Sequence, residues 1–266
     1  MIAVVDTHCH YAEPELAQDS DLAQARSSGL VDALVCATHS GDFEAVNATA
    51  HAQRLHYALG VHPLLVKDKA AIESEILAFE ETLKANEDDP LLAAVGEIGL
   101  DLYPGTCPLE LSAQIELFEA MLEAAENANL PVSIHSRKAL PHVMACLKKT
   151  HVTGVLHAFA GSFEEARQCF KLGFKLGFGP SLTYSGSRRI REVFTKLPED
   201  AYVLETDAPF MLTANRRAAG ETVCRPVDLF EVLQTAAELR NVSVESLAEQ
   251  STANALAVFP KLAADR

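Results

Sequence analysis

The 266-residue sequence predicts one α/β domain spanning residues 1–266, a (β/α)8 barrel of the TIM type. Short apolar runs that resemble strands alternate with helix-like stretches along the chain, at intervals of roughly 20–40 residues that leave room for a crossover helix. The runs are almost continuously apolar, as parallel strands are when helices cover the sheet. The eight expected strands are 2–7, 30–37, 56–61, 91–98, 130–135, 153–158, 174–179 and 201–206.

Helix boundary signals support this alternation. Ser162 and Glu165 form the pattern of a capping box, and Gly173 is placed to end the same helix. Gly29 ends the first expected helix, and Pro108 suits the first turn of another. Helices are expected over about 69–86 and 108–128, and over most of 226–259 with a break near 241–243.

Composition narrows the class of partner. The formal net charge of −15 and the pI near 5.0 disfavour a broad electrostatic grip on duplex DNA or on an anionic membrane. They still permit an enzyme that takes one strand end or a small phosphate ester into a local pocket. No apolar run approaches the ~18–20 residues of a membrane span, and the start has no basic leader. We therefore expect a soluble cytoplasmic protein with no membrane contact and no obligate protein partner.

The most informative motif is Asp6-Thr7-His8-Cys9-His10 at the end of the first expected strand. Residues i and i+2 of a strand share one face, so His8 and His10 point the same way and Cys9 points away, to pack between barrel and helices. Two imidazoles about 7 Å apart along the chain can bind one metal ion together.

Four more potential ligands close other expected strands: Glu97, His135, His157 and Asp207. In a parallel barrel the carboxyl ends of all strands meet at one mouth. A single histidine at a strand end is more often a core or surface group, but six such residues at one end argue against coincidence. They are too many for one tetrahedral ion with an open position, and they suit two ions about 3.5–4 Å apart, bridged by a carboxylate.

Other polar residues near the mouth have weaker assignments. His62 follows the third expected strand, and we favour substrate contact or a supporting role over direct ligation. His39 either faces the site or belongs to a surface loop. Asp6 and Asp101 are expected to be loop or supporting carboxylates, and Glu205 is expected to pair deeper in the barrel.

Three arginines are candidates for phosphate contact. Arg188 and Arg189 follow the seventh expected strand, and Arg225 lies in the long segment after the eighth. Barrel enzymes often hold phosphate in these loops, and arginine suits bidentate phosphate contact. The alternative is a solvated helix face, which we prefer for Arg191.

Six segments together resemble the TatD family of metal-dependent hydrolases, in the amidohydrolase-like superfamily. They recur in family order over about 200 of the 266 residues. The resemblance implies that His8, His10, Glu97, His135, His157 and Asp207 bind two divalent ions, with Glu97 bridging. It also implies phosphodiester hydrolysis, typically as a 3′→5′ deoxyribonuclease. The segments are DTHCH at 6–10, ALGVHP at 58–63, AVGEIGLD at 94–101, PVSIHSR at 131–137, GVLHAFAGS at 154–162 and LETDAPF at 204–210.

The resulting hypothesis is a phosphodiesterase or deoxyribonuclease that uses two ions of Zn, Mn or Mg. A metal-activated hydroxide attacks phosphorus, with Glu97 and Asp207 as catalytic carboxylates and Asp207 taking the proton. The substrate is a single-stranded DNA end or a small phosphodiester. Two alternatives stay open: hydrolysis of amide, lactone or ester bonds on the same scaffold, and a metal-binding protein without catalysis. The run Cys224-Arg225-Pro226 departs from the family pattern, and so does the loop 211–224, which leaves the natural substrate open.

Overall fold

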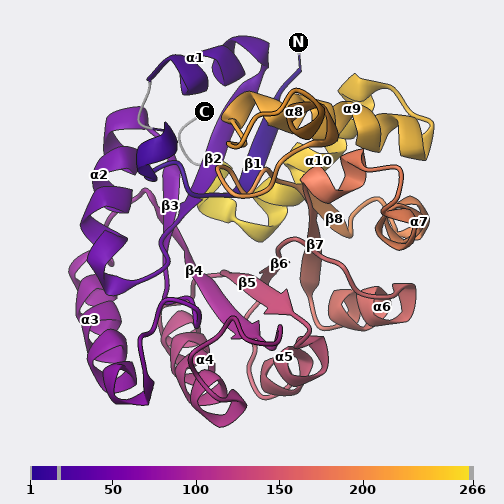
Figure 1. Cartoon of the computed structure of the whole chain (residues 1–266). Coiled ribbons are helices and arrows are strands. Elements are labelled where there is room, and N and C mark those ends of the chain that lie inside the picture. Colours follow the sequence, from indigo (N-terminus) through magenta and orange to yellow (C-terminus); the bar gives the residue numbers. More distant parts are fainter. Residues whose placement is uncertain (1, 17–18, 264–266) are drawn as a thin grey trace.

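The computed structural model describes residues 2–16 and 19–263, so Met1 and the last three residues of the expected domain lie outside it. Eight parallel strands form one sheet in the order β1 to β8, and the sheet curls into the predicted (β/α)8 barrel (Figure 1). The strands are β1 (Val4–Cys9), β2 (Leu30–Cys36), β3 (His56–Leu59), β4 (Leu92–Asp101), β5 (Val132–Arg137), β6 (Gly154–Leu156), β7 (Phe174–Phe178) and β8 (Tyr202–Leu204).

One α-helix follows each of the first seven strands and lies on the outside of the barrel (Figure 1). Three further helices follow β8, and the first of them is short. The helices are α1 (Asp19–Ser28), α2 (Phe43–Gln53), α3 (Ile72–Ala85), α4 (Leu111–Asn127), α5 (Leu140–Leu147), α6 (Phe163–Lys171), α7 (Arg188–Lys196), α8 (Ala214–Ala218), α9 (Leu229–Arg240) and α10 (Val244–Val258).

Most helix boundary signals act as the sequence indicated. The capping box at Ser162 is present, and Gly29 and Gly173 have φ values of 120° and 91° just beyond α1 and α6. The assignment of Pro108 to the first turn of a helix is wrong. Glu110 is extended, with φ −69° and ψ 161°, so α4 begins only at Leu111.

The expectation that Glu97 and His135 end their strands is also wrong. β4 continues to Asp101, and β5 continues two residues beyond His135. The pairing of β4 with β5 shifts between Val95 and Ile98, so Glu97 sits at an irregularity within the strand. Such irregularities re-aim a side chain, and they are common beside active sites.

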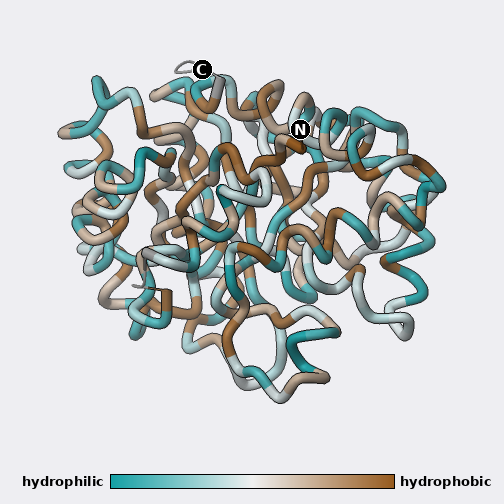
Figure 2. The backbone as a smooth tube through the Cα atoms, turned by 90° about the horizontal axis from the view of Figure 1, so that it is seen from above, coloured by the Kyte–Doolittle hydropathy of each residue, from teal (hydrophilic) through white to brown (hydrophobic). Residues whose placement is uncertain are grey.

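Apolar side chains fill the barrel in two layers. An inner cluster includes Val5, Leu34 and Val203 on the strands, together with Val258 and Phe259 at the end of α10. A larger cluster lies between the strands and the surrounding helices, and Cys9 belongs to it, as predicted. In Figure 2 many of the hydrophilic stretches lie on the outer turns of the chain. Among the described residues, no helix is long and apolar enough to span a bilayer.

Hydrogen bonds outside a regular ladder join β8 to β1 in the described part of the chain. The Asp207 backbone N–H donates to the His8 carbonyl at 2.9 Å, and the His10 N–H donates to the Ala208 carbonyl at 2.8 Å. The buried Asp6 carboxylate accepts from the Thr206 N–H at 2.9 Å and from the Thr206 hydroxyl at 2.6 Å. Asp6 thus ties the first strand to the segment after the last.

The Asp6 carboxylate also accepts from the Tyr11 hydroxyl at 2.6 Å. Burial raises the pKa of Asp6 to about 6, even though its hydrogen bonds act in the opposite direction. Burying the Asp6 carboxylate costs desolvation free energy, and its hydrogen bonds offset that cost. The same hydrogen bonds join the two edges of the sheet.

Asp6→Ala should lower the free energy of unfolding by about 2–4 kcal/mol, because it leaves the buried hydroxyls of Tyr11 and Thr206 without their acceptor. Urea unfolding of the metal-free protein measures this change. Glu73→Ala, at an exposed position of α3, is the control and should change stability by less than about 0.5 kcal/mol. Equal stability of Asp6→Ala and wild type would show that Asp6 does not support closure.

Candidate metal centre

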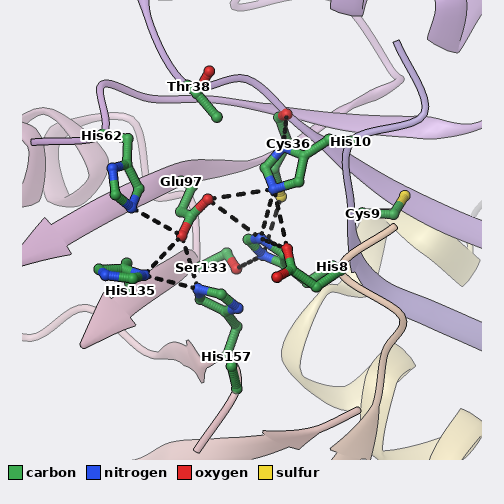
Figure 3. Close-up of polar contacts among 12 residues, drawn as sticks. His8, Cys9, His10, Cys36, Thr38, His62, Glu97, Ser133, His135 and His157 are labelled. Atoms are coloured by element: carbon green, nitrogen blue, oxygen red, sulfur yellow. Dashed lines mark hydrogen bonds and ion pairs between the residues drawn. The ribbon is translucent and has the colours of Figure 1, made fainter. Parts of the chain in front are cut away.

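The six predicted ligands converge at the carboxyl end of the barrel. His8, His10, Glu97, His135 and His157 point toward one another in Figure 3, and Cys9 points away from them. His8, Glu97 and His135 come from β1, β4 and β5. His10 and His157 directly follow β1 and β6, and Asp207 lies three residues after β8. All except His8 line a cavity of about 1230 Å³, and His8 is fully buried beneath it.

One oxygen of Glu97 belongs to a first group of ligand atoms. Glu97 Oε2 lies 3.5 Å from His8 Nε2 and 3.4 Å from His10 Nε2. Asp207 Oδ1 lies 3.3 Å from His10 Nε2 and 3.7 Å from His8 Nε2. The two imidazole nitrogens are 3.3 Å apart, as expected for side chains that share one strand face.

The other oxygen of Glu97 belongs to a second group. Glu97 Oε1 lies 2.7 Å from His157 Nε2, 3.2 Å from His135 Nδ1 and 3.3 Å from His62 Nε2. His135 Nδ1 and His157 Nε2 are 3.4 Å apart. Glu97 therefore stands between two clusters and presents one oxygen to each.

The spacing of these atoms fits the coordination sphere of a metal ion. Bonds of about 2.0–2.1 Å in a tetrahedral site place neighbouring ligand atoms roughly 3.3 Å apart. Three groups of donor atoms lie within 4.8 Å of one another: His8 with Glu97 and His157, His8 with His10 and Asp207, and His62 with Glu97 and His135. Imidazole and carboxylate donors suit zinc and manganese.

Hydrogen bonds to the remote ring nitrogens fix which nitrogen can bind metal. His10 Nδ1 lies 3.0 Å from the Cys36 carbonyl oxygen, which can only accept, so Nδ1 always carries a proton and Nε2 is the nitrogen that exchanges its proton for a metal ion. His135 Nε2 lies 3.0 Å from Asp101 Oδ2 and donates to it, so Nδ1, which faces Glu97, is the nitrogen that can bind metal once it has lost its proton. Asp101 thus acts as the expected supporting carboxylate.

His62 has the opposite arrangement. Its Nδ1 accepts from the Leu64 backbone N–H at 3.2 Å, so the proton of the neutral ring must be on Nε2. Burial is the largest cause that lowers the pKa of His62, and a lower pKa favours this neutral form. His62 is therefore a hydrogen-bond donor aimed at Glu97 Oε1, although its distances alone would also suit a ligand.

Glu205 lies behind His157, deeper in the barrel, as predicted. Its Oε1 accepts from the Ala158 N–H at 2.5 Å and lies 3.9 Å from His157 Nδ1. Among the described residues, His157 Nδ1 and Glu205 Oε2 have no hydrogen-bond partner. A Cβ at Gly177 would lie 2.0 Å from Glu205 Oε2, so a larger residue there would have to displace this carboxylate. Burial raises the pKa of Glu205 to about 8.

The charge of the cluster favours cations. Burial acts to raise the pKa of Glu97, but the surrounding histidines hold it well below its usual range. Burial opposes charge on His10, yet hydrogen bonds to Asp207 and Glu97 raise its pKa to about 10. Burial opposes charge on His135 as well, and its bonds to Asp101 and Glu97 raise its pKa to about 9. The ionised carboxylates thus keep the neighbouring imidazoles protonated. A divalent cation can take the place of these protons and balance the same negative charge.

The predicted phosphate contacts lie at different places. Arg189 lines the cavity and donates to the Ala160 carbonyl at 2.8 Å. Arg188 is exposed on α7, and Arg225 is paired with Asp21. Neither Arg188 nor Arg225 is among the described residues that line the cavity. His39 does line it, while its ring accepts from the Gly41 N–H at the start of a 3-10 turn.

Sequence reasoning missed two cationic side chains of the cavity lining, Arg137 and Lys138. A signal was available, because Arg137 lies two residues beyond His135 and thus on the same face of β5. Lys138 gave no such signal, since its position depends on the turn after the strand, where its φ is 58°.

Comparisons with known proteins agree with this architecture. A protein of Haemophilus influenzae described as an uncharacterized metal-dependent hydrolase is 35% identical over 264 residues, covering 96% of this chain and 98% of the relative. The human deoxyribonuclease TATDN3 is 31% identical over 272 residues, covering 98% and 96%. The crystal structure of YjjV, a TatD homologue of Escherichia coli, superimposes with a TM-score of 0.88 at 31% identity, covering 97% of this chain and 98% of that one.

A family model covers almost the whole chain. The model described as TatD related DNase matches residues 5–260, which include all six converging side chains. The chain therefore belongs to the TatD family and is a metal-dependent hydrolase.

Proposed function

We propose that this protein is a deoxyribonuclease of the 3′→5′ exonuclease type, which hydrolyses phosphodiesters in one barrel domain with two divalent ions. The observation that carries the proposal is the position of Glu97, whose two oxygens face two separate groups of ligand atoms. The presence of Arg189 in the cavity lining supports a phosphate substrate. The human relative named a deoxyribonuclease supports DNA as the substrate.

The proposed ligand sets follow from the two groups. His8, His10 and Asp207 would hold one ion, His135 and His157 the other, and Glu97 would bridge them. When bound, two such ions supply an acidified water molecule and positive charge beside the attacking and leaving oxygens. The histidine-rich set suits zinc or manganese, whereas magnesium prefers oxygen ligands.

The remaining roles belong to side chains around the ions. Asp207, 9% exposed at the cavity wall, takes the proton of the attacking water. His62 donates its Nε2 proton toward Glu97 and the oxygens of a bound phosphate. Arg189 binds a phosphate oxygen at the cavity wall.

A second candidate is hydrolysis of an amide, lactone or ester bond, because the same ligand arrangement can activate water against carbonyl carbon. The decisive test is digestion of single-stranded DNA labelled at its 5′ end, with Mg²⁺ or Mn²⁺, beside RNA, small phosphodiesters and a panel of amides and lactones. A ladder shortened stepwise from the 3′ end is expected. Hydrolysis of the amide or lactone panel without cleavage of any phosphodiester would select the second candidate.

The protein should bind up to two divalent ions per chain, because the six side chains form two groups around Glu97. Elemental analysis after loading with excess zinc or manganese, followed by gel filtration, gives the ratio. Glu97→Gln should lower it, because the amide offers only one oxygen to two ions. Loading of wild type that stays at one ion would contradict the two-ion centre.

Asp207→Asn should keep the fold and much of the metal but lower turnover by about 10²–10⁴-fold, since the amide can offer an oxygen to metal but cannot take a proton. Saturated turnover and metal content are measured on the same preparations. Asp88→Asn, at an exposed turn, is the control. Wild-type turnover by Asp207→Asn with both ions bound would show that the proton leaves by another route.

His62→Gln should retain both ions, because His62 is assigned as a donor, whereas His157→Gln should lose one. Turnover of His62→Gln should fall about tenfold to a hundredfold, the typical value of a hydrogen bond to a charged group. Titration against a chelating dye measures the ion affinities. Loss of an ion from His62→Gln would identify His62 as a ligand.

A further inference from the structure

The cavity walls differ in charge from one side to the other. Arg137 and Lys138 line the cavity at and just after the end of β5, Arg189 lines it from α7, and Glu165 lines it from α6. Leu65 and Phe210 line it near β3 and β8, and they are 50% and 60% exposed. Arg137 and Lys138 thus lie on the β5 side of the metal centre, while Arg189 has the carboxylate of Glu165 nearby.

Arg137 is held in place although it lies at the cavity mouth. Its guanidinium carbon lies 3.9 Å from the centre of the Tyr103 ring, which is the distance of a stacked cation–π pair. Its Nη1 lies 3.9 Å from Asp101 Oδ2, and its carbonyl accepts from the Leu102 N–H at 2.8 Å. Residues 101–103, at and just after the end of β4, therefore fix both the backbone and the plane of this side chain.

The guanidinium nevertheless keeps its hydrogen-bonding capacity. Arginine has five N–H donors, and within the described residues the Arg137 side chain donates no hydrogen bond. The side chain is 47% exposed, so these donors face the cavity mouth and solvent. A planar cation whose orientation is fixed and whose donors are available matches the geometry of a phosphate group.

Arg137 is also close to the metal centre. Asp101 Oδ2, which it approaches, lies 3.0 Å from Nε2 of His135, a proposed ligand. One carboxylate thus separates the guanidinium from a ligand of the second ion. The cavity of about 1230 Å³ exceeds the range of roughly 300–1,000 Å³ that is common for small-molecule sites. It has room for more than the phosphodiester that is cleaved.

We propose that Arg137, stacked on Tyr103 and followed by Lys138, forms a second phosphate subsite beside the metal centre. It binds the phosphate next to the one that is cleaved, so that the enzyme prefers substrates with at least two phosphates over isolated phosphodiesters. This inference rests on the proposed function, because it assumes a phosphodiester at the metal centre. Tyr103 acts as a positioning residue through Arg137.

The test compares kcat/KM for the thymidine dinucleotide TpT with the values for pTpT and TpTp, which carry one more phosphate on either side. Wild type should prefer one of the two phosphorylated dinucleotides by about tenfold or more, as expected for a charge-assisted contact. Arg137→Gln should lose this preference. Arg167→Gln is the matched control, because Arg167 is 49% exposed and paired with Glu164 outside the cavity lining.

Binding without turnover provides a second readout. Fluorescence anisotropy with a labelled dT octamer in excess chelator measures the affinity of the metal-free protein at several salt concentrations. Arg137→Gln should weaken binding about tenfold and lower the slope of log affinity against log salt by about 0.7, the contribution of one phosphate contact to a single strand. Tyr103→Leu should give a smaller loss of affinity, and in the dinucleotide assay its effect should appear mainly in KM.

The outcomes separate the two proposals. Equal kcat/KM of wild type for the three dinucleotides, or an unchanged preference and salt slope in a folded Arg137→Gln variant, would overturn the subsite while leaving the proposed function intact. Failure of wild type to cleave any phosphodiester would overturn the proposed function itself. Thermal unfolding of Arg137→Gln at the wild-type temperature confirms that the variant is folded.

Discussion

Closure of the barrel is the constraint on which the metal centre depends. His8 lies on the first strand, His10 directly follows it and Asp207 follows the last strand, so these side chains meet only when β1 and β8 become neighbours. Asp6 and Thr206 make that junction through two hydrogen bonds, and the Asp207 N–H donates directly to the His8 carbonyl. The bonds that close the sheet are therefore adjacent in sequence to the residues that would bind metal. A fault at this seam would damage stability and the site together.

In the buried metal centre, the charges of carboxylates and imidazoles balance one another. Burial penalises the ionised forms of Glu97 and Asp207, yet the imidazoles around them keep the pKa of both carboxyls low. His8 differs from His10 and His135, because burial is the largest cause that lowers its pKa, to about 4, and so keeps its ring neutral. A neutral imidazole is the form that binds metal, so the site prepares this ligand in advance.

The surrounding shell gives apparently similar histidines different functions. A carbonyl or a carboxylate at the remote nitrogen of His10 and His135 accepts a hydrogen bond from it, so the nitrogen that faces the centre is the one that can bind metal. A backbone N–H at the remote nitrogen of His62 does the reverse and makes it a donor. Asp101 contacts residues on both of its sides, because it accepts a hydrogen bond from His135 and also lies near the Arg137 guanidinium. One carboxylate, that of Asp101, therefore orients His135 in the metal centre and also holds Arg137 at the cavity.

The sequence alone determined the fold class and the set of six converging residues. Alternating apolar runs require covered parallel strands, and a parallel barrel gathers its carboxyl ends at one mouth whatever the details of the loops. It also fixed the common face of His8 and His10, because that follows from strand periodicity, and the comparisons place the chain in the family that the motifs indicated.

Only the tertiary structure decided how these residues are used. The irregularity that turns Glu97 between two clusters arises from pairing with β5, and the tautomer of His62 arises from the backbone N–H of Leu64. The tertiary structure also decided which arginines lie at the cavity. Arg189 lines the cavity, while the ion pair with Asp21, far away in sequence, holds Arg225 elsewhere. The stack of Arg137 on Tyr103 depends on the path of the chain after β4. Periodicity reports which face a residue occupies, but the partner that fixes its charge and direction comes from distant parts of the chain, and only the folded protein brings them together.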